Sequence, residues 1–436
     1  MYKLRILVLS IIICTALLAA CGRDSTMPTG QEHVYDIVCE IALPEPEPPE
    51  EVLLESPAMG RIAILTEPFG WGGVGWEWYS ANWLYEMHSA EMIVPDSRWG
   101  GSRGSMYVAA EEIINDPEIK VIIINSAPRG VNYFISKIRE QRSDIFIVYI
   151  EYDSDNYCDY PYISLNFSES VGMADLILNI DMLEMYRSLP VQAQALGAET
   201  LVFFYIDGWD DNSYWTGRSY FYDERAIMRE MSDEIGLCFV EVARSPECIG
   251  CNSDFFMYLQ YNVPRLIENY GRDIAFLGLR GARVFTTSAR EGVIYLSSYR
   301  QSSPARLARD MREYMLIPSS LLGVGNETLS DKNNLTSIIE ELRNALDEHG
   351  MQGRVSTWPV SASTLLTYAA VEYGIMWMNG DVPQYGVDME ILQRIMAGFI
   401  AEYSGEYGLG VHLSQRTRDG NVYENYVLVF MDFMTY

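Results

Sequence analysis

Two glycine-rich stretches have residue spacings that could do chemistry. Gly70 to Gly75 matches GxGxxG, the spacing of a dinucleotide-binding loop, and Gly100 to Gly104 matches GxSxG, the spacing around a nucleophilic serine. Each motif requires the glycines to follow a strand at once, but residues 67–69 and 95–99 intervene here. We therefore expect loops at helix starts, no nicotinamide or other cofactor, and no catalytic role for Ser102.

A CxxC pair, Cys248 and Cys251, leaves three chemistries open. The pair could be a local disulfide or two free thiols, half of a zinc site, or a redox centre. Zinc needs two further ligands, and no histidine lies close to the pair in the sequence. We favour the disulfide or the free thiols and expect no metal. Cys39, Cys158 and Cys238 give the chain behind residue 21 an odd number of cysteines, so at least one thiol is unpaired or intermolecular.

Polar and aromatic side chains gather directly after the predicted strands. Open α/β sheets bind ligands at the carboxyl ends of their strands, aromatic faces stack on sugars, bases or cations, and a few polar groups fix the orientation. The acidic groups favour a ligand with hydroxyl or amine donors, whereas Arg98, Arg244 and Arg280 could hold a carboxylate or a phosphate, so the charge of the ligand stays open. The predicted ligand-binding residues are Thr66, Glu67, Trp71, Asp96, Asn125, Ser126, Glu151, Asp207, Trp209, Arg280 and Trp358.

The elements that must position these residues alternate between strands and helices. Near-continuous apolar strands that alternate with helices predict parallel sheets covered on both faces. The pattern runs through residues 61–179 and starts again at residue 182, so we predict an α/β fold with two Rossmann-like lobes. The expected strands span 61–66, 91–95, 120–125, 144–149, 174–179, 200–206, 237–242, 273–279 and 426–430. The expected helices span 76–88, 106–115, 132–141, 182–196, 222–235, 262–270, 335–349 and 363–379.

The first residues indicate an export signal. Lys3 and Arg5 precede an apolar run, residues 6–18, that is too short to span a bilayer comfortably. Leu18-Ala19-Ala20-Cys21 resembles the lipobox of bacterial lipoproteins. This resemblance implies a signal peptide over residues 1–20, cleavage before Cys21 and acylation of that cysteine, for example with palmitate. The alternative is an ordinary cleaved signal peptide that happens to contain a cysteine.

Charge and composition restrict the partners. The net charge of −29 repels nucleic acid and anionic lipid headgroups, so we expect membrane contact through the lipid anchor only and an extracytoplasmic location. Residues 21–58 contain an acidic, proline-rich run, Pro44 to Glu51, that favours an extended tether.

Several segments, in order and in spacing, resemble a family of functionally uncharacterised bacterial lipoproteins with a type I periplasmic-binding-protein-like fold. They span residues 114–124, 136–148, 174–202, 234–242, 263–277, 350–360 and 425–436. The family implies a fold and a compartment but no ligand, and the tryptophan- and glycine-rich residues 67–90 depart from its pattern. The fold implies one lobe from residues 60–178 and about 360–405, and a second from 180–358 and about 420–436.

The leading hypothesis from the sequence is a solute-binding lipoprotein. A small ligand would bind between the lobes, and the closed form would be presented to an ABC-type importer or a sensor. One alternative is an extracytoplasmic enzyme that uses a carboxylate such as Glu67 or Asp207, and another is a structural lipoprotein without a ligand.

Overall fold

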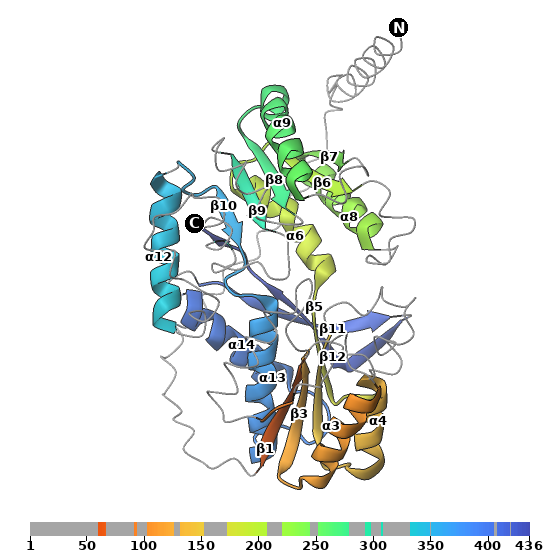
Figure 1. Ribbon diagram of the computed structural model, residues 1–436. Helices are drawn as coiled ribbons and strands as arrows, with labels where there is room; N and C mark the ends of the chain where they lie inside the picture. Colours follow the sequence, from red (N-terminus) through yellow and green to blue (C-terminus); the bar gives the residue numbers. More distant parts are fainter. Residues whose placement is uncertain are drawn as a thin grey trace, which may run out of the picture. The chain divides into compact units, whose positions relative to one another are not determined.

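A computed structural model shows two β-sheets, the helices that pack on them and the connections between the two sheets (Figure 1). The described residues are 60–66, 91–93, 103–125, 131–151, 172–206, 220–244, 252–278, 293–297, 307, 332–348, 350–404, 408–418 and 420–436. The predicted helix over 76–88, the signal peptide, the tether and the CxxC pair lie outside these residues.

The first sheet has strand order β11-β12-β5-β4-β3-β1-β2. Its strands are β1 (Arg61–Thr66), β2 (Glu91–Ile93), β3 (Ile119–Asn125), β4 (Phe146–Glu151), β5 (Leu176–Ile180), β11 (Val411–Arg418) and β12 (Asn421–Met431). All neighbouring strands are parallel except β11 and β12, which form an antiparallel hairpin at one edge. Because β12 pairs with β5, residues near the end of the chain complete a sheet whose first strand begins at Arg61.

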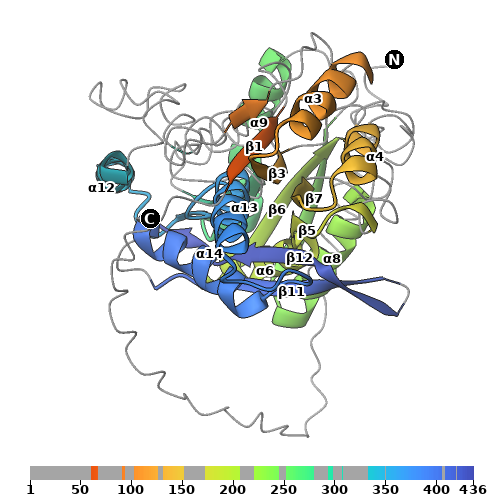
Figure 2. The ribbon, with the colours of Figure 1, turned by 90° about the horizontal axis from the view of Figure 1, so that it is seen from below.

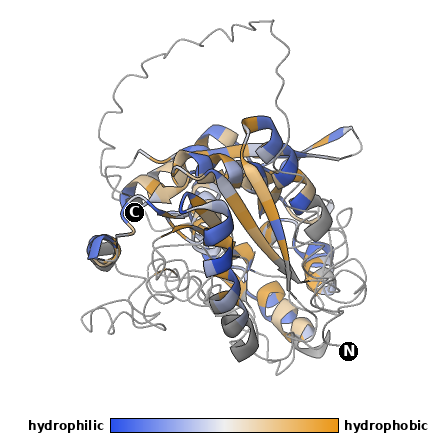
Figure 3. Ribbon diagram, turned by 90° about the horizontal axis from the view of Figure 1, so that it is seen from above, coloured by the Kyte–Doolittle hydropathy of each residue, from blue (hydrophilic) through white to orange (hydrophobic). Residues whose placement is uncertain are grey.

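The two faces of the first sheet divide its apolar side chains by strand alternation. Ile62 and Val121 belong to the cluster that includes α13 (Ala362–Asn379) and α14 (Met389–Ser404). Ala63 and Ile122 belong to the other cluster, with α3 (Arg103–Asn115) and α4 (Val131–Gln141). Figure 2 shows the two helix pairs on opposite faces, and Figure 3 shows the strands coloured as hydrophobic. The apolar runs in the sequence thus mark strands that are buried on both faces.

The second sheet has strand order β13-β10-β9-β8-β6-β7. Its strands are β6 (Thr200–Ile206), β7 (Cys238–Arg244), β8 (Ile274–Gly278), β9 (Ile294–Ser297), β10 (Val355–Thr357) and β13 (Met434–Thr435). Its helices are α6 (Met182–Ala195), α8 (Tyr220–Ile235), α9 (Asn252–Tyr270) and α12 (Lys332–Glu348). Counted in chain order, the first five strands of each sheet are all parallel and are arranged 2-1-3-4-5, the flavodoxin-like doubly wound order. In the first sheet, β12 continues this order as a sixth parallel strand next to β5.

Three crossovers join the two sheets. The first leads from β5 through Asp181 into α6, the second from β10 through residues 358–361 into α13, and the third from β12 through residues 432–433 into β13. Each crossover leaves the carboxyl end of a strand, and β12 lies parallel to β5. Connectivity therefore brings the carboxyl edges of both sheets to the crossovers.

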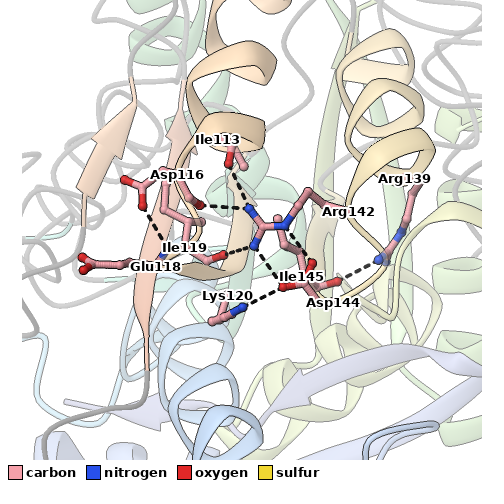
Figure 4. A network of polar contacts seen from close by, with 9 residues as sticks. All are labelled: Ile113, Asp116, Glu118, Ile119, Lys120, Arg139, Arg142, Asp144 and Ile145. Carbon is pink, nitrogen blue, oxygen red and sulfur yellow. Dashed lines mark hydrogen bonds and ion pairs between the residues drawn. The ribbon is translucent and has the colours of Figure 1, made fainter.

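The amino edge of the first sheet is held by two arginines (Figure 4). Arg142 donates to the carbonyl oxygens of Ile113, Asp116 and Ile119, at 2.9–3.3 Å, and its Nε lies 2.7 Å from Oδ1 of Asp144. Hydrogen bonds from Arg142 and Lys120 hold the pKa of Asp144 far below its usual range. Arg139 binds the carbonyls of residues 145 and 173 in the same way. These bonds fix the turns from which β3 and β4 start.

The end of the chain differs from the expected distribution between the lobes. The sequence assigned residues 420–436 to the second lobe, but β12 pairs in the first sheet and β13 alone pairs in the second. Strands β9, β10 and β11 and helix α14 were not expected, and α9 begins ten residues before the predicted helix over 262–270. The two parallel sheets with covering helices agree with the predicted fold class.

Candidate functional site

Three of the four predicted site residues that the structure describes lie at the carboxyl edge of the first sheet. Thr66 and Asn125, the last residues of β1 and β3, are partners in the strand register. Glu151, the last residue of β4, is the partner of Asn179 on β5. The backbone thus brings Thr66, Asn125 and Glu151 to neighbouring strand ends, as expected when parallel strands end together. The side chains of Thr66 and Glu151 lie outside the description.

Asn125 is fully buried between β3 and α13. Its Nδ2 donates to Oγ1 of Thr367 at 3.0 Å, and the Thr367 hydroxyl donates to the carbonyl of Ser363 at 2.7 Å. A buried carboxamide that lacked such a bond would cost roughly 1–3 kcal/mol. Thr367 therefore fixes the orientation of the amide at the end of β3.

The start of α13 adds hydroxyl groups to the same region. Ser361 caps the helix: its Oγ accepts from the N–H of Thr364 at 3.2 Å. The same Oγ lies 3.0 Å from Oγ of Ser363 and 2.7 Å from Oγ1 of Thr364. Together with Thr367 and Asn125, these groups form a track of neutral hydrogen-bonding side chains. Such groups can donate and accept hydrogen bonds without carrying a charge.

Two polar residues in this region, Asn179 and Thr367, were not predicted from the sequence. Asn179 donates from Nδ2 to the Tyr426 hydroxyl at 2.8 Å, and its Oδ1 accepts from the N–H of Ile180 at 2.7 Å. The rule that selected Asn125, a polar residue that closes an apolar strand, would also have selected Asn179. Thr367 carried no comparable signal, since it lies in the middle of a strongly apolar helix.

Trp358 lies in the second crossover and is 1% exposed. Its ring is 6.4 Å from the ring of Phe433 in the third crossover. The tryptophan thus packs between two connections of the lobes, and its predicted ligand contact stays a prediction.

The remaining predicted ligand-binding residues lie outside the described residues, as does Cys21. They are Glu67, Trp71, Asp96, Ser126, Asp207, Trp209 and Arg280. Of the cysteines behind residue 21, the described residues include Cys238 alone, which is half-buried at the start of β7. Within the described ranges, no group of three His, Cys, Asp or Glu side chains could hold a metal ion. Among the same residues, no helix combines the length and the apolar character that a membrane span requires.

Comparisons with known proteins agree with this topology. The sequence profile of the family described as "Protein of unknown function (DUF3798)" matches residues 104–356. No curated protein matches the chain. A crystal structure described as a "Putative transcriptional regulator" from Clostridium difficile 630 is similar over 86% of this chain and 99% of its own, with 17% identity and a TM-score of 0.64.

Two further solved structures share less of the geometry. An ABC transporter solute-binding protein from Clostridium phytofermentans with bound L-rhamnose has 9% identity and a TM-score of 0.40, over 86% of this chain and 96% of its own. A sugar ABC transporter from Actinomyces odontolyticus has 13% identity and a TM-score of 0.43, over 75% and 86%. The family profile covers more than half of the chain, so the chain, with its two doubly wound sheets, belongs to the DUF3798 family.

Proposed function

We propose that this protein binds a small polar ligand between its two lobes and presents it, from the outer side of a membrane, to an ABC-type importer or a sensor. The single observation that carries the proposal is the topology of the crossovers. All three leave the carboxyl ends of strands, so the edges at which doubly wound sheets bind ligands adjoin the connections of the lobes. A ligand held there would touch both lobes.

The polar groups near these edges support a ligand with hydrogen-bonding groups. Asn125, Thr367 and Ser361 are neutral, and the predicted contacts Glu67, Glu151 and Asp207 would accept bonds from hydroxyls or amines. Trp71 and Trp209 would stack on the apolar face of the same molecule. A sugar, a polyol or an amine fits this combination.

Ligand binding is tested on the chain purified without denaturation. Native mass spectrometry should show an added small molecule, and a set of sugars, polyols and amines should contain compounds that raise the melting temperature. Glu67→Gln and Asp207→Asn should each weaken the binding of such a compound about tenfold or more, because each loses a charge-assisted hydrogen bond.

Glu112→Gln is the matched control, since Glu112 is exposed in the last turn of α3, away from the carboxyl ends of the strands. If no compound binds and no molecule is carried through purification, the binding proposal is wrong. If Glu112→Gln weakens binding as much as the other two variants do, the proposed site is wrong.

The anchoring part of the proposal rests on Cys21. Cys21→Ser should leave the chain uncleaved or release it from the membrane fraction, because the acyl chains provide the membrane affinity. Membrane fractionation with and without detergent measures this. A processed Cys21→Ser protein that still sediments with the membrane contradicts the lipid anchor but leaves the ligand proposal standing.

A further inference from the structure

Asp432, in the third crossover, forms hydrogen bonds with the start of strand β11 and with Gly410, which precedes it. The N–H of Asp432 donates to the carbonyl of Gly410 at 3.0 Å, and the Gly410 N–H donates to Oδ2 of Asp432 at 2.7 Å. The other oxygen, Oδ1, lies 2.8 Å from Nε2 of His412. A Cβ atom on residue 410 would lie 2.9 Å from Oδ2 of Asp432, so this approach requires the glycine.

The same strand is joined to the first crossover through Asp181. The hydroxyl of Ser414 donates to Oδ2 of Asp181 at 3.4 Å, while Oδ1 accepts from the N–H of Glu184 at 3.0 Å and caps α6. The N–H of Asp181 donates to the carbonyl of Val429, on the partner strand of β11. One carboxylate therefore links a strand of the first sheet to a helix of the second lobe.

Alternation along β11 explains why both contacts come from one strand. His412 and Ser414 are two residues apart, so their side chains project from the same face. His412 also stacks on Phe430 with ring centres 5.8 Å apart, and Phe430 meets Phe433 edge-on. Phe433 in turn packs near Trp358 of the second crossover.

We propose that β11 is a brace that couples the first and third crossovers, so that they loosen together rather than independently. Asp181 and Asp432 are its positioning residues, and His412 and Ser414 are the contacts on the strand. The device requires no ligand and therefore goes beyond the proposed function. Both aspartates are partly exposed, and one bond is long, so each contact is individually weak. Weak bonds of this kind affect the local opening of the crossovers but contribute little to the overall stability of the fold.

Amide hydrogen exchange on the full chain, read by mass spectrometry, tests the coupling. His412→Phe keeps a ring on Phe430 and removes the nitrogen that faces Asp432. Exchange should then rise about fivefold both in residues 431–433 and in residues 180–184, although the substitution touches only the third crossover. Ser414→Ala should produce the reciprocal effect, in which residues 431–433 loosen although only the contact with Asp181 is lost.

Ser188→Ala is the control, because the Ser188 hydroxyl bonds to the carbonyl of Met185 within α6. It should change neither crossover. In the double variant His412→Phe with Ser414→Ala, the gain in exchange should be smaller than the product of the two single gains, since either change alone releases the coupled unit.

Either of two results would overturn the proposal. In the first, His412→Phe raises amide exchange only in residues 431–433. In the second, the gain in exchange of the double variant equals the product of the two single gains. Asp432→Asn is a conservative variant, because its amide can still accept from Gly410 and face His412. Exchange close to the parent is expected, and a fivefold rise at residues 180–184 contradicts the assignment. The readout is independent of ligand, so failure of the binding experiments leaves this result unaffected.

Discussion

The amino edge of the first sheet and the crossover region are held by different kinds of interaction. At the amino edge, the guanidinium of Arg142 binds three carbonyls and a carboxylate, and these short, charge-assisted bonds allow one arrangement only. At the crossovers, rings of Trp358, Phe433 and Phe430 pack together. The polar bonds beside them include the neutral contact of Thr357 with Tyr436 and the carboxylate contacts of Asp181 and Asp432. Apolar contacts are not directional, so they survive small displacements that would break the Arg142 network. The amino edge of the first sheet is thus rigidly held, whereas the crossover region is suited to bending.

The largest effect is expected at the crossovers. Trp358→Ala should lower the free energy of unfolding by about 4 kcal/mol, because it removes a fully buried ring next to Phe433. Urea denaturation measures the loss, and Trp358→Phe should cost markedly less. The loss should be the same at low and at high salt, since no charge is involved. A loss below about 1 kcal/mol would show that Trp358 does not support the crossovers.

The next largest effect is expected at the amino edge. Arg142→Met should cost about 3 kcal/mol, because three part-buried carbonyls and the Asp144 carboxylate lose their partner. In contrast to the tryptophan variant, the cost should shrink in about 1 M NaCl, where ionic attraction is screened. Arg187→Met is the control, since that side chain is more than half exposed and lies 3.9 Å from Glu184. If Arg142→Met and Arg187→Met lowered the free energy of unfolding equally, the Arg142 network would not distinguish the amino edge from the crossover region.

A smaller effect is expected where α13 meets the sheet, between the two regions. A Cβ on Gly374 would lie 2.8 Å from Cγ1 of Val121, so Gly374→Ala should destabilise the protein by about 2 kcal/mol. Gly398→Ala on α14 meets no atom within 4 Å and should instead stabilise by about 0.5 kcal/mol. Thermal unfolding of the two variants in parallel provides the measurement. Stabilisation by both would mean that helix propensity, not close packing, governs these sites.

The smallest effect concerns acid. The pKa of Asp144 in the folded protein is depressed below its ordinary value of 3.8 by Arg142 and Lys120. Its contribution to stability is therefore present above pH 3.8 and is lost as the pH falls toward the folded-state pKa. Asp144 is half exposed, so the contribution is limited to about 1 kcal/mol. Asp144→Asn should be less stable than the parent at pH 6 and equal to it in strong acid; parallel stability curves would contradict the assignment.

The sequence predicted the buried strands well, because their apolar runs report burial on both faces. β1 spans the predicted residues, and β3 begins one residue before the expected start. β9 and β10 are short, and the alternation of β11 ends at Ser414, after which residues 415–418 are all polar, so none of the three carries a strong local signal. The pairing of β12 with β5 was missed because the partner of a strand is decided by distant residues.

The candidate site was predictable to the same degree. The rule that parallel strands end together brought Thr66, Asn125 and Glu151 to neighbouring positions. The partner of Asn125 was not predictable, because Thr367 lies 242 residues away and sits in a helix whose pattern indicates only a core. The sequence shows which residues are polar, but the tertiary packing of distant segments determines which polar side chains contact each other.

The pairing of β5 with β12 has a consequence for how the protein folds during synthesis. The first sheet, which begins at residue 61, gains its sixth and seventh strands and its α13–α14 cover only when the last 75 or so residues have left the ribosome. Until then the face that carries Ile62 and Val121 lacks the helices that cover it in the finished protein. Contacts of such high sequence separation slow folding and leave apolar surface accessible to aggregation. We therefore expect the nascent chain to depend on chaperones, and truncations that remove β12 to yield insoluble protein rather than an isolated second lobe.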